Sequence, residues 1–128
     1  MLLEWLESDF SVAKWTGKRE IEDLGVFSFW SRTDKELSLV CPTHCVPKDV
    51  ETREDGWVAF RVVGKMEFSL VGILAEISSC LAKANISLFA ISTFDTDYIL
   101  VKKENSTLAE EMLLGQGWKF QSRKEPKI

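Results

Sequence analysis

The sequence predicts an α+β fold, with short strands in its first half and the order strand, helix, strand, strand, helix, strand in its second half. Two observations predict this order. Residues 57–64 place Val58, Phe60 and Val62 on one face and a more mixed set with Arg61 on the other, which predicts a strand with one well-covered face. From residue 69 on, apolar residues recur every three or four positions, which is typical of a helix that buries one face. Further along, a short polar turn separates two segments rich in β-branched and aromatic residues, as in a hairpin.

Three short strands are expected in the first half, over Phe10–Thr16, Val26–Arg32 and Glu36–Val40. The last two are separated by Thr33-Asp34-Lys35, and such a short polar link between strand-like segments predicts a hairpin. Residues 43–56 contain a proline and several charges and show no sustained period. We expect an irregular connector there.

The second half begins with an expected strand at Trp57–Gly64, and an amphipathic helix follows it. The apolar stripe of this helix comprises Leu70, Ile73, Leu74, Ile77, Cys80, Leu81 and Ala84. The hydroxyl of Ser69 can cap the first turn. Asn85 can end the helix, because asparagine tolerates the left-handed conformation found just beyond helix ends.

A second hairpin and a second helix complete the predicted order. Strand-like segments at Ser87–Phe94 and Tyr98–Lys102 flank the polar turn Asp95-Thr96-Asp97. Thr107 and Glu110 have the spacing of a capping box at the start of a helix, and a last strand is expected near Trp118–Phe120. This order predicts the ferredoxin-like arrangement, in which two helices cover one face of an antiparallel sheet.

Composition excludes several classes of partner. The formal net charge is −4, and lysines and arginines are scattered along the chain, so we expect no nucleic-acid partner. Apolar runs fall short of the roughly 18 to 20 residues that a membrane helix needs, so we expect no membrane partner. The N-terminal sequence MLLEWLESDF carries glutamates where a secretory signal would carry positive charge, and we therefore expect a cytoplasmic protein.

Cys41, His44 and Cys45 are potential ligands of a soft metal ion and lie within five residues. A structural zinc site normally takes four ligands with paired spacing, and the remaining cysteine, Cys80, lies inside the helical pattern. We therefore favour ordinary, partly buried thiols over a metal site. Neither a nucleophile partner for His44 nor a phosphate-binding glycine loop can be recognised, so we expect no catalytic residues, no cofactor and no enzymatic activity.

Three stretches carry a resemblance to a known family. They are Gly72-Ile73-Leu74-Ala75 at the start of the helix, Ile91–Tyr98 at the second hairpin, and Phe27–Pro42 at the first hairpin. Together they resemble the ACT domains of small tandem-ACT proteins, which are similar to aspartokinase regulatory domains and to the cytosolic arginine sensors of animals. The resemblance implies a ferredoxin-like ACT domain over residues 55–128, preceded by a degenerate, mostly β ACT-like half over residues 1–54.

The resemblance also implies a ligand and a site. ACT domains commonly bind amino acids where the first strand turns into the first helix, close to a neighbouring domain. The residues implied on this chain are Phe68, Ser69, Leu70, Val71 and Gly72 at the helix start, with Ile91, Thr93, Phe94 and Asp97 on the opposite wall. Backbone amides at the helix start would receive the carboxylate of an amino acid. A pocket shared between copies would require a homodimer, and a regulatory module can also have a protein partner.

Each implied role has an alternative. Gly72 can serve close packing of the helix, Phe94 can belong to the sheet core, and Asp97 can serve the turn through local hydrogen bonds. The leading functional hypothesis is a non-catalytic, amino-acid-binding regulatory module that responds through assembly or partner contact. The main alternative is a ligand-independent dimerisation or protein-interaction module. A third reading, an enzyme that uses Cys41, His44 or Cys45, requires a thiol of depressed pKa.

Overall fold

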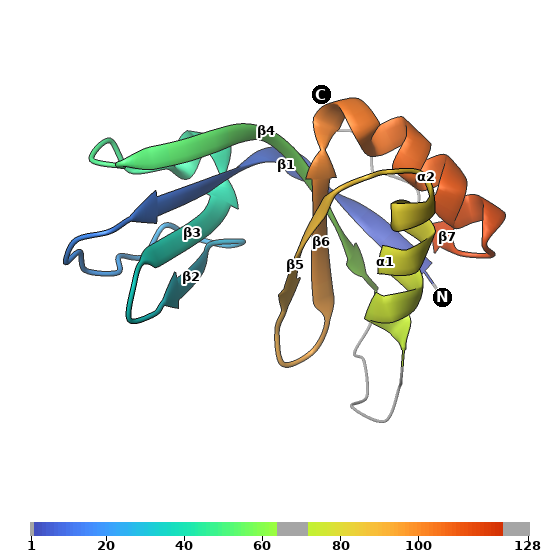
Figure 1. The fold of residues 1–128 in the computed structure, drawn as a ribbon, viewed down its shortest axis with the longest axis horizontal. Coiled ribbons are helices and arrows are strands. Elements are labelled where there is room, and N and C mark those ends of the chain that lie inside the picture. The colour runs from blue at the N-terminus through green and yellow to red at the C-terminus, as the bar shows by residue number, and fades with distance from the viewer. Residues whose placement is uncertain (1, 64–71, 122–128) are drawn as a thin grey trace. The chain divides into compact units, whose positions relative to one another are not determined.

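The computed structural model describes residues 2–63 and 72–121 of the chain. Seven strands, two α-helices and two short 3-10 helices are described (Figure 1). In chain order they are β1 (Leu2–Trp15), β2 (Phe29–Arg32), β3 (Leu37–Pro42), η1 (Thr43–Cys45), β4 (Thr52–Val62), α1 (Ile73–Lys83), β5 (Leu88–Ser92), β6 (Asp97–Lys102), η2 (Lys103–Asn105), α2 (Ser106–Gly115) and β7 (Lys119–Phe120).

The chain divides into two compact units. Unit 1 comprises residues 1–7 and 58–128, and unit 2 comprises residues 8–57. The long strands β1 and β4 each pass from one unit into the other, so the first residues of the chain belong to the same unit as the second half. The division into an ACT-like half at 1–54 and an ACT domain at 55–128 stays a prediction.

Unit 1 is a sheet covered on one face by α1 and α2, as the sequence predicts. Within it, β4 lies between β1 and β6, β5 pairs with the other side of β6, and β7 pairs in parallel with β1. The chain's first strand is thus inserted between the first and last strands of the βαββαβ order. The sequence did not predict a strand at residues 2–9, where charged residues interrupt the apolar pattern.

The core of unit 1 explains why these segments adopt these structures. Alternate strand residues and one stripe of each helix are buried together, and this cluster comprises Leu3, Trp5, Val58, Phe60, Val62, Ile73, Ile77, Cys80, Leu81, Ile86, Ile99, Val101, Ala109, Leu113 and Trp118. The predicted apolar stripe is confirmed at Ile73, Ile77, Cys80 and Leu81. Leu70 and Ser69 lie outside the described residues.

The ends of the helices differ in part from the predictions. Asn85 follows α1 with a left-handed φ of 57°, as expected. The capping box at Thr107 is wrong, because α2 already begins at Ser106 and its N-cap residue, Asn105, makes no side-chain hydrogen bond to the helix. The Ser106 hydroxyl instead donates to the carbonyl oxygen of Lys103, at 2.8 Å, in the 3-10 turn that leads into α2.

Unit 2 is an antiparallel sheet in which the strands follow the order β2, β3, β1 and β4. The predicted hairpin is confirmed, with Arg32 paired to Leu37 across the turn. The expected connector at residues 43–56 is wrong in its last part, because Thr52–Gly56 belong to β4. All five of these residues are exposed, so the segment lacks the apolar alternation by which a half-buried strand is recognised. The unit's core comprises Ala13, Trp15, Leu37, Leu39 and Cys41.

The two hairpins repeat the same local structure at a spacing of 60 residues. The second strand of each has six residues, Leu37–Pro42 in unit 2 and Asp97–Lys102 in unit 1. Each strand is followed directly by a three-residue 3-10 helix, at Thr43–Cys45 and Lys103–Asn105. The second unit therefore shares the hairpin and the 3-10 turn of the ferredoxin-like unit.

Candidate functional site

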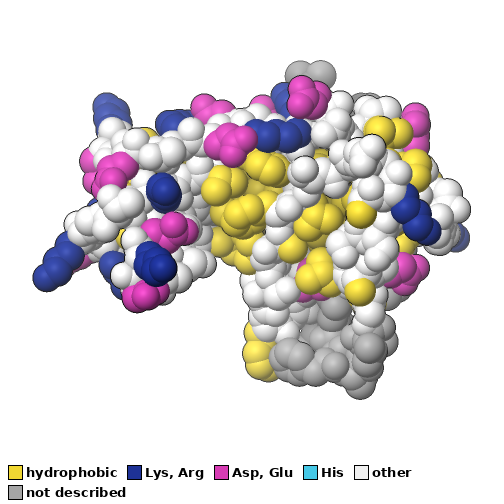
Figure 2. All heavy atoms as spheres, viewed as in Figure 1, with side chains coloured by type: hydrophobic (Ala, Val, Ile, Leu, Met, Phe, Trp, Pro, Cys, Tyr) yellow, Lys and Arg dark blue, Asp and Glu magenta, His cyan; other side chains and the backbone are white. Residues whose placement is uncertain are grey.

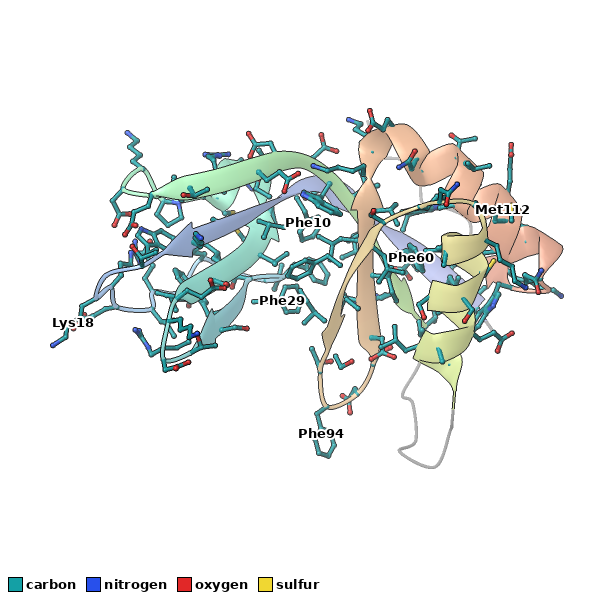
Figure 3. The ribbon with its side chains drawn as sticks, viewed as in Figure 1. Phe10, Lys18, Phe29, Phe60, Phe94 and Met112 are labelled. Atoms are coloured by element: carbon teal, nitrogen blue, oxygen red, sulfur yellow. The ribbon has the colours of Figure 1, made fainter. Side chains whose placement is uncertain are left out.

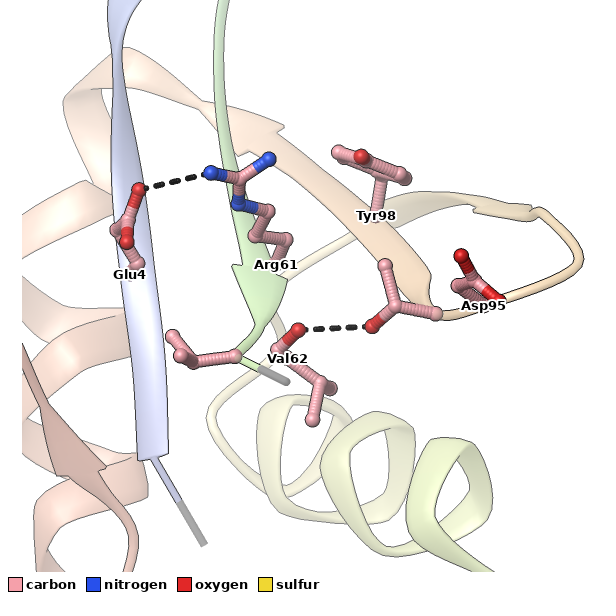
Figure 4. A pocket seen from close by; sticks show the side chains of 7 residues that line it. Glu4, Arg61, Val62, Asp95 and Tyr98 are labelled. Atoms are coloured by element: carbon pink, nitrogen blue, oxygen red, sulfur yellow. Dashed lines mark hydrogen bonds and ion pairs between the residues drawn. The ribbon is translucent and has the colours of Figure 1, made fainter. Parts of the chain in front are cut away.

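A pocket of about 290 Å³ lies in unit 1 beside the turn of the β5–β6 hairpin (Figure 4). It is lined by Glu4, Arg61, Val62, Val63, Asp95, Thr96 and Tyr98. These residues come from β1, from the end of β4, and from the hairpin. Its volume is near the lower end, about 300 Å³, of pockets that hold small ligands.

Strand alternation explains why these side chains meet. Glu4 lies between Leu3 and Trp5, which point into the core beneath the helices. Arg61 and Tyr98 alternate in the same way with core residues of β4 and β6. Because successive side chains of a strand point to opposite faces, the three polar side chains project from the sheet face that the helices leave uncovered.

An ion pair dominates the electrostatics of the pocket. The guanidinium of Arg61 and the carboxylate of Glu4 are 3.1 Å apart, and their side chains are 33% and 29% exposed (Figure 4). A hydrogen bond with Tyr98 is the main cause that raises the pKa of Arg61 above its usual value, and the nearby negative charge of Glu4 raises it further. Arg61 is therefore a fixed cation, and its planar N–H groups suit a carboxylate.

The hairpin turn is tied to the end of β4 by a hydrogen bond. The Thr96 hydroxyl donates to the carbonyl oxygen of Val62 at 2.8 Å. Within the turn, the amide of Thr93 donates to the carbonyl oxygen of Thr96 at 2.9 Å. These bonds hold the turn that carries Asp95 beside the strand that carries Arg61, so groups of opposite charge line one cavity.

Of the predicted helix-start residues, the structure describes Gly72. Phe68, Ser69, Leu70 and Val71 lie outside the described residues. Gly72 is the N-cap of α1 and has a left-handed φ of 85°, which a glycine adopts without strain. A Cβ built on Gly72 would meet no described atom within 4 Å, so close packing against the described residues does not require glycine here.

The predicted residues of the opposite wall do not line the pocket. Phe94 is 73% exposed and points away from the tip of the hairpin (Figure 3). Ile91 is partly buried in β5, and Thr93 closes the turn. Asp97 is only 7% exposed and accepts a hydrogen bond of 2.6 Å from the Ser92 hydroxyl. The pocket is instead lined by their neighbours Asp95, Thr96 and Tyr98.

The sequence contained a signal for the residues that were missed. Arg61 is the one charged residue in the apolar segment Trp57–Gly64, and Glu4 is placed between two core residues of β1. A charged residue on an otherwise apolar strand marks a position where the opposite sheet face meets water or a charged partner. Bringing Glu4 beside Arg61 required the insertion of β1 next to β4, which the sequence did not predict.

The burial of Cys41 does not favour a reactive thiol in the cysteine segment. Among the described residues, no group of three or more His, Cys, Asp or Glu side chains could hold a metal ion. Cys41 is fully buried, and its burial, followed by the nearby Cys45, raises its pKa to about 11. The thiolate of Cys41 is therefore scarce at neutral pH, whereas a nucleophilic cysteine needs a lowered pKa.

The charges on the surface and the lengths of the described helices bear on possible partners. Positive and negative side chains are interspersed on the face shown in Figure 2. Within the described ranges, no helix is long and apolar enough to cross a bilayer.

Comparison with known families matches residues 52–114 to the ACT domain. This segment contains all of β4, with Arg61, together with helix α1, the complete β5–β6 hairpin and most of α2. The match therefore covers the part of unit 1 that carries most of the pocket. No curated protein matches the chain.

Several solved structures have the same fold. A protein from Agrobacterium tumefaciens is 28% identical, with a TM-score of 0.87 over 99% of this chain and 96% of that one. An aspartokinase structure with alpha and beta subunits is 12% identical, with a TM-score of 0.64 over 90% and 96% of the two chains. A putative C-terminal regulatory domain of aspartate kinase from Porphyromonas gingivalis is 15% identical, with a TM-score of 0.53 over 88% and 92%.

Proposed function

From the premise that this chain is an ACT-domain protein, matched over residues 52–114, we propose that it is a non-catalytic regulatory module that binds an amino acid. The single observation that carries the proposal is the pocket with charges of both signs beside the β5–β6 hairpin of that domain. A free amino acid has both a carboxylate and an ammonium group, and such a pocket offers a partner to each. The likeness to aspartokinase structures, one described as a regulatory domain, supports regulation over catalysis.

We place the remainder of the site at the start of α1 and along the hairpin. It would comprise the predicted residues Phe68, Ser69, Leu70, Val71 and Gly72, with Ile91, Thr93, Phe94 and Asp97 on the hairpin side. The start of α1 and the hairpin turn lie at the same end of unit 1, which supports this placement (Figure 1). The first-turn amides of a helix lack partners within the helix and attract anions.

The proposed response is a change in assembly or in contact with a protein partner. A site at one end of a single ACT domain would be completed by a second copy of the chain, so we propose a homodimer, acting in the cytoplasm. Ligand binding can shift such an equilibrium only if the ligand prefers one state. The exposed Phe94 also favours the alternative, a ligand-independent interaction module, because a large apolar side chain at a hairpin tip suits a protein contact.

Thermal unfolding with each of the twenty amino acids, followed by tryptophan fluorescence, tests the proposal. A ligand at 100 times its dissociation constant stabilises by about 2.7 kcal/mol, which shifts the midpoint by several degrees in a domain of this size. Light scattering with and without the most stabilising amino acid then measures assembly. A selective shift supports the regulatory module. If no amino acid shifts the unfolding midpoint and the protein is a dimer with or without amino acid, the ligand-independent alternative is supported.

A further inference from the structure

We infer that Glu4, Arg61 and Asp95 recognise the main-chain ammonium and carboxylate groups of a free amino acid. This inference rests on the proposed function and names the residues and the part of the ligand that they hold. Three observations carry it: charges of both signs around one small cavity, an ion pair already formed within it, and hydrogen bonds that hold its walls together.

The arrangement of charges matches a zwitterion. Arg61 extends from β4, Glu4 from the neighbouring strand β1, and Asp95 from the hairpin turn. The planar guanidinium can hold a carboxylate through two parallel hydrogen bonds, and a carboxylate accepts hydrogen bonds from an ammonium group. The ligand's carboxylate therefore binds Arg61, and its ammonium group binds one of the two carboxylates, Glu4 or Asp95, which lie on either side of Arg61 in Figure 4.

The existing ion pair explains why a zwitterion is preferred over a simple anion or cation. In the free protein Glu4 lies 3.1 Å from Arg61 and balances its charge. A zwitterion can contact both side chains and leave neither charge without a counterpart. A carboxylic acid alone would compete with Glu4 for Arg61, and an amine alone would compete with Arg61 for Glu4. In a half-buried site, separating one such pair without replacing it is costly.

Neighbouring contacts keep the charged groups in place. The contact of 3.1 Å with Glu4 limits the rotation of the Arg61 guanidinium. The bond of 2.8 Å from Thr96 to the carbonyl oxygen of Val62 holds the turn that carries Asp95 against the end of β4. Binding groups on rigid strands lose little freedom when a ligand arrives, which favours affinity for a small molecule.

Glycine is the smallest probe of this chemistry, and acetate and methylamine are its two halves. Titrations monitor the NMR signal of the Arg61 side-chain Nε–H group in the full-length protein. Glycine at millimolar concentration is expected to shift this signal, and acetate or methylamine should need a concentration about tenfold higher, since each makes only one of the two charged contacts. An equal response to acetate would overturn the inference in favour of a simple anion site.

Matched variants test the same residues with the most stabilising amino acid of the panel. Arg61→Met should weaken its binding by about tenfold or more, because a charged hydrogen-bonding partner is lost. Arg53→Met is the control, since Arg53 lies on the same strand, has a side chain 35% exposed against 33% for Arg61, and forms an ion pair of 2.9 Å with Asp55 in unit 2. It should change binding by less than about twofold.

Glu4→Gln provides a readout that a purely structural role would not produce. Removing the Glu4 charge should weaken glycine binding and strengthen acetate binding, because Arg61 loses its internal competitor. Glu7→Gln, on an exposed position of the same strand, should change neither affinity. If no amino acid binds the unaltered protein, both the proposed function and this inference are contradicted. If an amino acid binds equally well to Arg61→Met, the inference alone is overturned.

Discussion

Thr33 and Thr93 close two hairpins with the same hydrogen bonds. The amide of Thr33 donates to the carbonyl oxygen of Glu36 at 2.9 Å, and the amide of Thr93 donates to that of Thr96 at the same distance. Each hydroxyl donates to the same carbonyl oxygen as its own amide, at 3.3 Å and 3.1 Å respectively. Because the pattern recurs in unit 2, outside the ACT match, it identifies Thr93 as a turn residue.

Thr93→Ala and Thr33→Ala should therefore each lower the free energy of unfolding by about 0.5 to 1.5 kcal/mol, the usual net value of an intramolecular hydrogen bond. Urea denaturation of the two variants and the unaltered protein measures this. Thr93→Ser keeps the hydroxyl and should retain most of the stability. A Thr93→Ala protein of full stability that has lost amino-acid binding would instead support the predicted ligand role.

Gly72→Ala should cost about 1 to 2 kcal/mol of stability, because an L-residue is strained in the left-handed conformation. The φ of Gly72 is 85°, and an added Cβ meets no described atom within 4 Å, so the penalty comes from the backbone alone. Gly17→Ala is a matched control, because its Cβ also meets nothing described and its φ is not in the left-handed range. That change should be neutral or slightly stabilising.

Ser92→Ala should destabilise the hairpin more than a typical surface substitution. Ser92 and Asp97 are paired across β5 and β6, and the hydroxyl donates to the Asp97 carboxylate at 2.6 Å. Asp97 is 7% exposed, so loss of this donor leaves a buried acceptor less satisfied, at about 1 to 3 kcal/mol. Denaturation midpoints measure the effect. Ser31→Ala, at an exposed position of strand β2, is a suitable control.

The fold of unit 1 could be predicted because its signals are local. The period of α1, the hairpin turn (predicted at residues 95–97 and found at residues 93–96) and the left-handed Asn85 each follow from residues that are close in sequence. The insertion of β1 beside β4 depends on contacts between distant residues, and Thr52–Gly56 lack an apolar face. Neither feature could therefore be predicted from a local sequence pattern.

The residues that line the pocket were not predicted, for a geometric reason. The hairpin was identified correctly, but adjacent strand residues point to opposite faces. Asp97 shares its face with Ile99 and Val101 in the core, whereas Tyr98 points to the pocket. A shift of one residue along the strand therefore exchanges a pocket residue for a buried one. Glu4 is 57 positions from its partner Arg61, and no local pattern relates them.

Cys41 should resist alkylation while the protein is folded. Its side chain is fully buried and its pKa is raised to about 11, so little thiolate is present at pH 8. Cys80 is also buried and has a raised pKa, whereas Cys45 is partly exposed. Brief treatment with iodoacetamide and mass spectrometry should therefore find Cys45 modified first. Preferential labelling of Cys41 would contradict this prediction and support the alternative of a catalytic thiol.

Acid should weaken unit 2 through the clamp formed by Arg19 and Asp49. The guanidinium donates two hydrogen bonds to the Asp49 carboxylate, at 3.2 Å and 3.1 Å, and lies 4.8 Å from the ring centroid of Trp15. The hydrogen bond from Arg19 is the main cause that lowers the pKa of Asp49 below its usual value. The clamp thus stabilises the folded state above the unfolded pKa of aspartate, about 3.9, and this contribution is lost as the pH falls through the lower, folded pKa.

Asp49→Asn and Arg19→Met should each flatten the fall in unfolding free energy below about pH 4, because neither variant retains the charged pair. Chemical denaturation at a series of pH values, followed by tryptophan fluorescence, measures this slope. The double variant should have the same slope as either single one, since both changes remove one interaction. Part of the slope should persist, because hydrogen bonds from Thr16 and Ser11 also lower the pKa values of Glu51 and Asp55. An unchanged slope in Arg19→Met would show that the clamp does not control the acid response.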